Sequence, residues 1–100
     1  MKLGILVTKV RHLGHIVDLT KAAIGKDHEV AIFVMDEGTQ LLGDRKFSDL
    51  AKLNRVSVSF CEHSAEAHGI DKTKLVEEIE SGSQFGNAMM NHNSDRVISL

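Results

Sequence analysis

Short, mostly apolar runs alternate along the chain with stretches in which apolar residues recur every three or four positions. Residues Lys2 to Thr8 form one apolar run of strand length, and His28 to Met35 form a second. Between them, apolar residues from Leu13 to Ile24 fall on one face of a predicted helix, which Gly25 with Lys26 can end. Strands that are apolar on both faces are typical of a sheet covered by helices on both sides. The pattern therefore indicates an α/β fold.

The middle of the chain predicts a loop, a helix and a third strand. Residues 36–44 have the sequence DEGTQLLGD, in which Gly38 and Gly43 mark a loop. Apolar residues then recur at helical spacing over residues 46–53, and residues 55–61 form a short run rich in valine and serine. We expect this run to be the third strand.

The last third of the chain predicts a helix, a flexible segment and a closing strand. Asp71 is a candidate N-cap for a helix over residues 71–80. Residues 81–86 are short, polar and glycine-rich and are expected to be flexible. Residues 87–92 can form a last helical turn or two, and residues 95–100 a fourth strand. The residues expected on the buried side of the helix over residues 71–80 are Leu75, Val76 and Ile79.

The order of these elements predicts how the strands pair. Strands joined through helices by short connections pair in parallel, through right-handed crossovers. We therefore predict a single domain over residues 1–100, a three-layer α/β/α sandwich with a mainly parallel sheet of four to five strands. Functional groups in such sheets gather beyond the carboxyl ends of the strands. The candidate loops are residues 8–15, 36–40 and 61–68.

Cys61 is the only cysteine and ends the third predicted strand. Alternation places Val58 and Phe60 on one face of that strand and Ser59 and Cys61 on the other, more polar face. If a helical turn begins directly after Cys61, its free N–H groups point back toward the sulfur. Such N–H groups, and a positive charge on His63, would lower the pKa of the thiol. The alternative is an inert cysteine that only fills a strand end.

Two other kinds of site remain open from the residues alone. Zinc is one, although no paired metal-binding spacing is present. An anion site at the start of the first helix is the other, formed by Lys9, Arg11 and His12. The candidate zinc ligands are Cys61, His63 and His68, with His12 or His92.

Composition and charge narrow the function classes. The net charge is −2 without a basic stripe, and the only aromatic residues are four phenylalanines, so we expect no nucleic-acid partner. The apolar runs are too short to span a bilayer, and the first residues read as a strand rather than an export signal. A lone cysteine without an export signal predicts a cytoplasmic protein.

Several motifs resemble one family when they are taken together. The strand VSVSFC followed by Ser64 and HGID is similar to the corresponding region of the DsrE/DsrF-like family of small α/β sulfur-relay proteins. HEVAIFVMDEGTQLL resembles the second strand and loop of that family, and SDRVISL resembles its last strand. The resemblance covers nearly the whole chain, in the same order.

The resemblance implies a sulfur carrier or sulfurtransferase. Cys61 would hold sulfane sulfur as a persulfide and pass it from a donor protein to an acceptor protein, without a metal or an organic cofactor. His63 and Ser64 would stabilise the thiolate, with His68 and His12 as more distant candidates. The family also implies a homo-oligomer, a trimer or a hexamer. This agrees with the expectation that short sheet edges are covered in native proteins.

A second hypothesis assigns the same fold to another class of protein. Here the chain is a non-catalytic interaction or small-ligand-binding module in which Cys61 is structural. The basic residues after the first strand would then bind an anion or a partner's tail. Phe85, Met89 and Met90 could cover an adaptable interface, or could cap the core beside the last strand.

Overall fold

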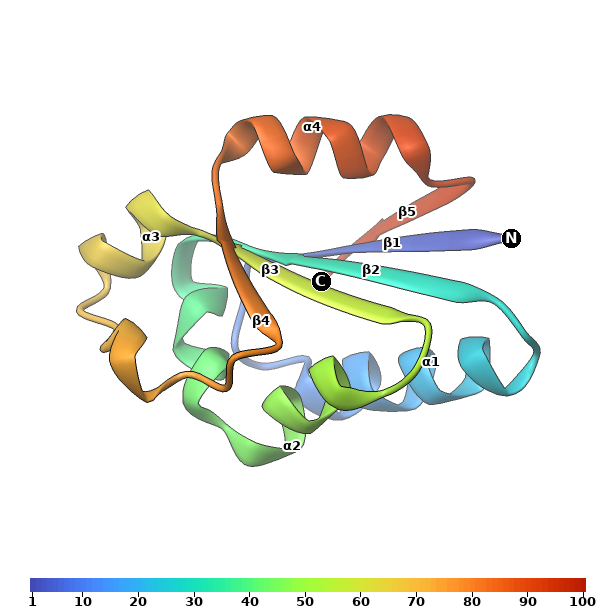
Figure 1. Cartoon of the computed structure of the whole chain (residues 1–100), viewed down its shortest axis with the longest axis horizontal. Coiled ribbons are helices and arrows are strands. Elements are labelled where there is room, and N and C mark those ends of the chain that lie inside the picture. Colours follow the sequence, from blue (N-terminus) through green and yellow to red (C-terminus); the bar gives the residue numbers. More distant parts are fainter.

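The computed structural model describes residues 1–100 and contains a five-stranded sheet in the order β4-β3-β2-β1-β5. The strands are β1 (Lys2–Val7), β2 (Glu29–Val34), β3 (Val56–Cys61), β4 (Ile79–Gly82) and β5 (Arg96–Ser99). Every neighbouring pair is parallel. The helix α4 (Gln84–Asn93) covers one face of the sheet, and α1 (Leu13–Gly25) with the short α2 (Arg45–Ser48) covers the other (Figure 1). The predicted three-layer α/β/α sandwich is therefore confirmed.

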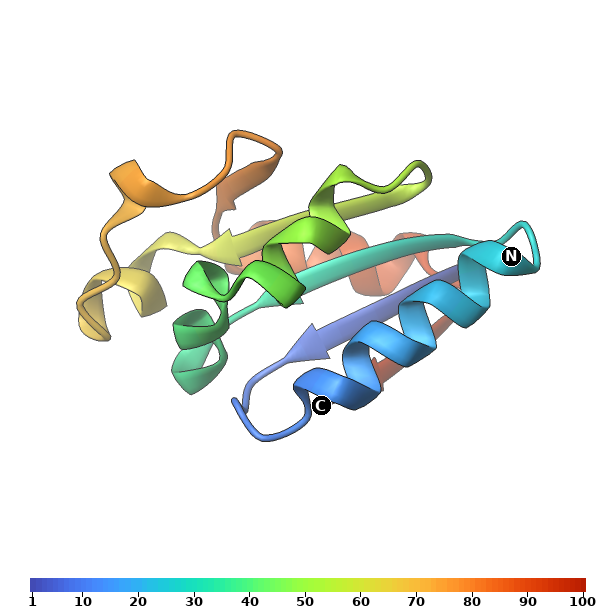
Figure 2. The same cartoon turned by 90° about the horizontal axis from the view of Figure 1, so that it is seen from below.

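Helices and 3₁₀ segments connect the strands. They are α1 (Leu13–Gly25), the 3₁₀ segments η1 (Asp36–Gly43) and η2 (Asp49–Lys52), α2 (Arg45–Ser48), α3 (Glu62–Ala67), the 3₁₀ turn η3 (Lys72–Lys74) and α4 (Gln84–Asn93). Seen from below, α1 and the α2 region lie side by side across one face of the sheet (Figure 2). α4 lies alone on the opposite face. No helix is long and apolar enough to cross a membrane.

The two faces of the sheet bury different amounts of apolar surface. The face toward α1 and α2 holds a cluster of 17 buried residues, in which Ile16 and Phe47 are fully buried. The face toward α4 holds a cluster of only four buried residues: Ala31, Phe33, Cys61 and Met90. Phe60 belongs to the large cluster and Cys61 to the small one. The alternation predicted for the third strand is therefore confirmed.

The prediction of a helix over residues 71–80 is wrong. Asp71 does act as an N-cap, accepting a hydrogen bond from the Thr73 N–H at 3.0 Å, but the turn that follows ends at Lys74. The chain then forms β4, in which Ile79 pairs with Val58 and is buried. An isolated short helix is marginal in water, so pairing along the free edge of β3 outweighs the helical spacing.

Two segments predicted as loops are more ordered than expected. Residues 36–43 form η1, which buries Leu41 and Leu42 against the large core. Residues 81–86 contain the end of β4 and the first turn of α4, where Ser83 Oγ accepts the Phe85 N–H at 3.3 Å. The predicted last helical turns therefore belong to a helix of 10 residues. In both segments, glycine and serine residues mark turns and caps within ordered structure.

Candidate functional site

A hollow of about 490 Å³ lies at the carboxyl edge of the sheet. It is formed where β2 ends, where β3 turns into α3, and where β4 turns into α4. All three junctions lie at the same edge because the strands are parallel. The lining residues are Met35, Asp36, Cys61, Glu62, His63, Ser64, Gly82, Ser83 and Gln84.

Cys61 forms the inner wall of this hollow. Its side chain is 4% exposed and packs in the small cluster with Phe33 and Met90. Its register partner in β4 is Gly82. A Cβ at position 82 would meet the Phe60 carbonyl oxygen at 3.5 Å and the Phe33 ring at 3.8 Å. Gly82 therefore contributes backbone rather than a side chain to the lining of the hollow.

The surroundings of Cys61 favour the thiolate. Burial raises the pKa of the thiol. Hydrogen bonds to the sulfur from the Ser64 hydroxyl, the Ser64 and His63 N–H groups and the Gln84 amide together lower it by more than burial raises it. The net result is a pKa below the ordinary value for cysteine. The two N–H donors are free because α3 begins at Glu62, directly after the cysteine. The helical turn expected after Cys61 is thus present.

The structure brings together only some of the residues predicted for the site. His63 and Ser64 line the hollow with Cys61, and Ser64 is 7% exposed. His68 lies at the far end of α3, as its C-cap, and does not line the hollow. His12 lies at the N-cap of α1, and also lies outside the hollow.

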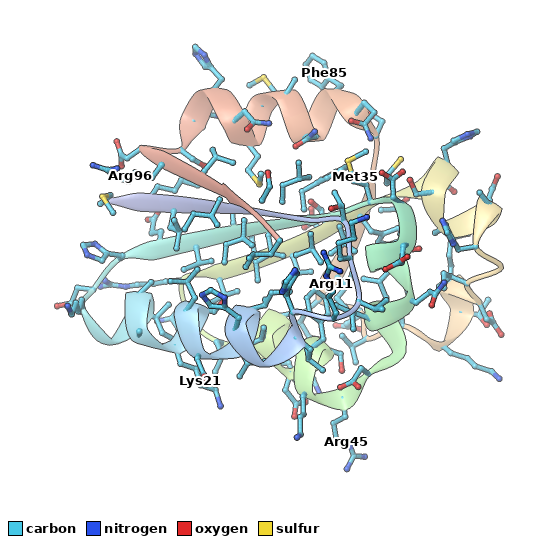
Figure 3. The ribbon with its side chains drawn as sticks, turned by 180° about the vertical axis from the view of Figure 1, so that it is seen from behind. Arg11, Lys21, Met35, Arg45, Phe85 and Arg96 are labelled. Carbon is cyan, nitrogen blue, oxygen red and sulfur yellow. The ribbon has the colours of Figure 1, made fainter.

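Several lining residues were missed by the sequence analysis. Ser83 and Gln84 were assigned to a flexible segment, yet the Gln84 amide reaches both the Cys61 sulfur and Met35 Sδ, the latter at 3.7 Å. Met35 lies beneath the start of α4 (Figure 3). Asp36, the first residue of η1, has a φ of 50°, a left-handed conformation that aspartate tolerates better than most residues. A serine followed by a helical apolar pattern was the available signal for the α4 junction.

The two other candidate sites find little support. No group of three or more His, Cys, Asp or Glu side chains is arranged to hold a metal ion, so the proposed zinc ligands do not converge. In the loop after β1, the Arg11 Nε–H points to His12 Nε2 at 3.4 Å. Glu37 Oε1 accepts the Val10 N–H in the same loop at 3.3 Å. The Glu37 carboxylate therefore already contacts the backbone of the loop that the sequence predicted as an anion-binding site.

Comparison with known proteins gives a family match and a fold match. The family model described as the DsrE/DsrF-like family matches residues 1–100. The YchN protein of E. coli has a similar structure, with a TM-score of 0.76 and 17% identity over 100% of both chains. MTH1491 of Methanobacterium thermoautotrophicum, described as a protein of unknown function, has a TM-score of 0.79 and 14% identity, over 99% of this chain and 98% of its own. No curated protein matches the chain.

Proposed function

Because the chain belongs to the DsrE/DsrF-like family, we propose that it is a sulfur carrier that holds sulfane sulfur as a persulfide on Cys61 and passes it to a partner protein. The observation that supports this most directly is the lowered pKa of a thiol that faces a hollow at the carboxyl edge of the sheet. A thiolate is the nucleophile that sulfur transfer requires. A lone cysteine also has no second thiol in the chain with which to form a disulfide.

Loading and delivery are two exchanges at sulfur. In loading, the Cys61 thiolate attacks the outer sulfur of a donor persulfide. A new S–S bond forms on Cys61, the donor S–S bond breaks, and its electron pair leaves with the donor as a thiolate. In delivery, an acceptor thiolate attacks the outer sulfur on Cys61, and Cys61 leaves as a thiolate. No external oxidant or reductant is consumed in either step.

The geometry of the hollow supports storage as well as attack. A persulfide places one additional sulfur about 2.05 Å from Cys61 Sγ. The hollow of about 490 Å³ has room for that atom and for the approaching end of a donor or acceptor chain. The same Ser64 and Gln84 donors that stabilise the thiolate are available to it when it leaves during delivery.

Ser64→Ala should weaken thiolate stabilisation without disturbing the fold. Removal of the hydroxyl donor raises the pKa of Cys61, so alkylation by iodoacetamide at neutral pH should slow severalfold and its pH profile should move to higher pH. The measurement is the alkylation rate between pH 5 and pH 10. Ser57→Ala, at an exposed position of β3, the strand that ends at Cys61, is the matched control. An unchanged profile for Ser64→Ala would contradict the role of this hydroxyl.

We also propose that the carrier self-associates through α4 and the β5 edge. Within α4, Met90 is buried against the sheet, whereas Phe85 is 73% and Met89 42% exposed. Phe85 projects from the outer side of α4 (Figure 3). In the edge strand β5, Val97 and Ile98 are also exposed. Exposed apolar residues and an unpaired strand edge are features that native proteins usually cover.

Phe85→Ser combined with Met89→Ser should shift the protein toward the monomer. The change removes apolar contact area from the exposed side of α4 while leaving Met90 in the core. Sedimentation at micromolar concentration measures the mass of wild type and variant. Lys21→Ser, on α1 at the opposite side of the molecule, is the control and should leave the mass unchanged. A monomeric wild-type protein would count against the self-association that we propose.

One observation favours the second candidate, a non-catalytic interaction module. Cys61 is almost fully buried and packs against Phe33 and Met90, as a structural cysteine would. In this case the hollow binds a partner segment or a small ligand, and the sulfur takes no part. The two candidates differ in what Cys61→Ala does, because only the carrier depends on the thiol. For either candidate we place the protein in the cytoplasm, where a free thiol stays reduced.

A further inference from the structure

Glu62 lies where its charge can oppose the function of Cys61. It follows the cysteine directly and lines the same hollow. A carboxylate near a thiolate disfavours ionisation of the thiol, with an energy that grows as the distance and the effective dielectric constant fall. The ionisable residues that line the hollow beside the thiol are Asp36 from η1, and Glu62 and His63 from α3. The residues that β4 and α4 contribute carry no charge.

Two groups hold the Glu62 carboxylate on the other side of the sheet. Lys72 Nζ lies 2.8 Å from Glu62 Oε1, and the hydrogen bond and charge of Lys72, with a hydrogen bond from Ser81, lower the pKa of Glu62. Ser81 pairs in register with Phe60, whereas Gly82 pairs with Cys61. Successive strand residues project to opposite faces. The Glu62 carboxylate is therefore held on the Phe60 side, and the thiol lies on the α4 side.

The turn η3 fixes Lys72 for this contact. The Asp71 carboxylate accepts the N–H of Thr73 at 3.0 Å, and the Thr73 hydroxyl also donates to it. Lys72 Nζ contacts Glu66 Oε1 at 3.3 Å as well as Glu62, so it joins η3 to the first two turns of α3. The Lys72 side chain is 34% exposed, against 83% for Lys74. The two lysines of this turn thus have different surroundings.

We propose that Lys72 is a positioning residue for Cys61: it holds the Glu62 carboxylate on the opposite face of the sheet from the thiol and neutralises its charge. The inference rests on the proposed role of Cys61 as a nucleophile. This inference assigns a role to η3, the short turn that forms where the sequence predicted a helix. Lys72 acts on the thiol through Glu62, not by contacting the sulfur.

The test is a double-mutant cycle read by thiol alkylation. Lys72→Met frees the carboxylate and leaves it uncompensated, so iodoacetamide alkylation at pH 7 should slow about threefold, and the pH profile should move to higher pH. Lys72→Met combined with Glu62→Gln should return the rate to within about twofold of wild type, because the charge to be neutralised is gone. Lys74→Met removes the same charge two residues away and should have no effect.

Each outcome of the cycle decides the inference. An unchanged rate for Lys72→Met, or a double variant as slow as the single one, would overturn it. If Lys72→Met does not fold, Lys72→Gln, which keeps a polar side chain without the charge, provides the test. This variant should slow alkylation about threefold at pH 7, and a rate equal to that of wild type would overturn the inference. Sulfur loading is measured separately, so a protein that passes the cycle but does not load sulfur contradicts the proposed function and leaves the role of Lys72 standing.

Discussion

Cys61→Ser should abolish the loading of sulfur. A serine hydroxyl does not ionise at neutral pH and cannot form a persulfide. No other side chain that lines the hollow is a thiol, so none can replace Cys61. The measurement is the intact mass of the protein after incubation with a persulfide donor. Wild type should gain the mass of one sulfur atom and lose it again when a thiol reductant is added. The variant should keep its original mass throughout.

Cys61→Ala separates the two candidate functions. It removes the thiol and leaves a small apolar residue against Phe33 and Met90. The carrier should lose transfer completely, whereas an interaction module should keep its affinity for a partner. A Cys61→Ser protein that gains the same sulfur mass as wild type would be incompatible with persulfide storage on this residue. Far-ultraviolet circular dichroism of both variants checks that the fold is retained.

Gly38→Ala should destabilise the protein by about 2 to 3 kcal/mol. Gly38 lies in η1 against β1, and a Cβ at this position would meet the Val7 carbonyl oxygen at 2.6 Å and the carbonyl carbon at 3.0 Å. These are backbone atoms, and the same carbonyl accepts the Met35 N–H at 2.9 Å. The clash therefore has to shift the segment that ends β2 beside the hollow. Thermal unfolding should show a Tm lower by about 10 °C or more.

Gly43→Ala is the matched control for this substitution. Gly43 ends the same 3₁₀ segment, and a Cβ there would meet no atom within 4 Å. Reduced freedom of the unfolded chain should leave stability unchanged or raise it by about 0.5 kcal/mol. If both variants unfold at the same temperature, close packing of η1 against β1 does not contribute to stability as we describe.

Apolar periodicity was sufficient to predict the layers and most of the strands. β1, β2 and β3 were found within a residue or two because each is a continuous run flanked by polar residues. β4 was missed because Ile79, its only buried residue, falls at helical spacing from Leu75 and Val76 and so predicted a helix. Its conformation depends on pairing with β3, an interaction between distant segments that local spacing does not encode.

The candidate site could be predicted only where it follows a single strand. Cys61, His63 and Ser64 are close in sequence, so alternation and the start of α3 bring them together. Gln84 reaches the sulfur only because β4 places the start of α4 beside it. His12 and His68 were chosen for their chemical type. His12 lies at the N-cap of α1 and His68 at the C-cap of α3, and both are outside the hollow. Long-range pairing decides these positions.

The position of β4 at the sheet edge links the reactivity of the thiol to local opening. β4 pairs only with β3, over four residues, and its last residue, Gly82, leads directly to Ser83 and Gln84. Short edge elements open with a lower free energy than the whole protein. In such an opened state Cys61 loses the Gln84 hydrogen bond while β1, β2 and β3 remain paired. The nucleophilicity of the sulfur should therefore change each time β4 opens. Amide hydrogen exchange of β4 measures the rate of this opening, which is unrelated to global unfolding.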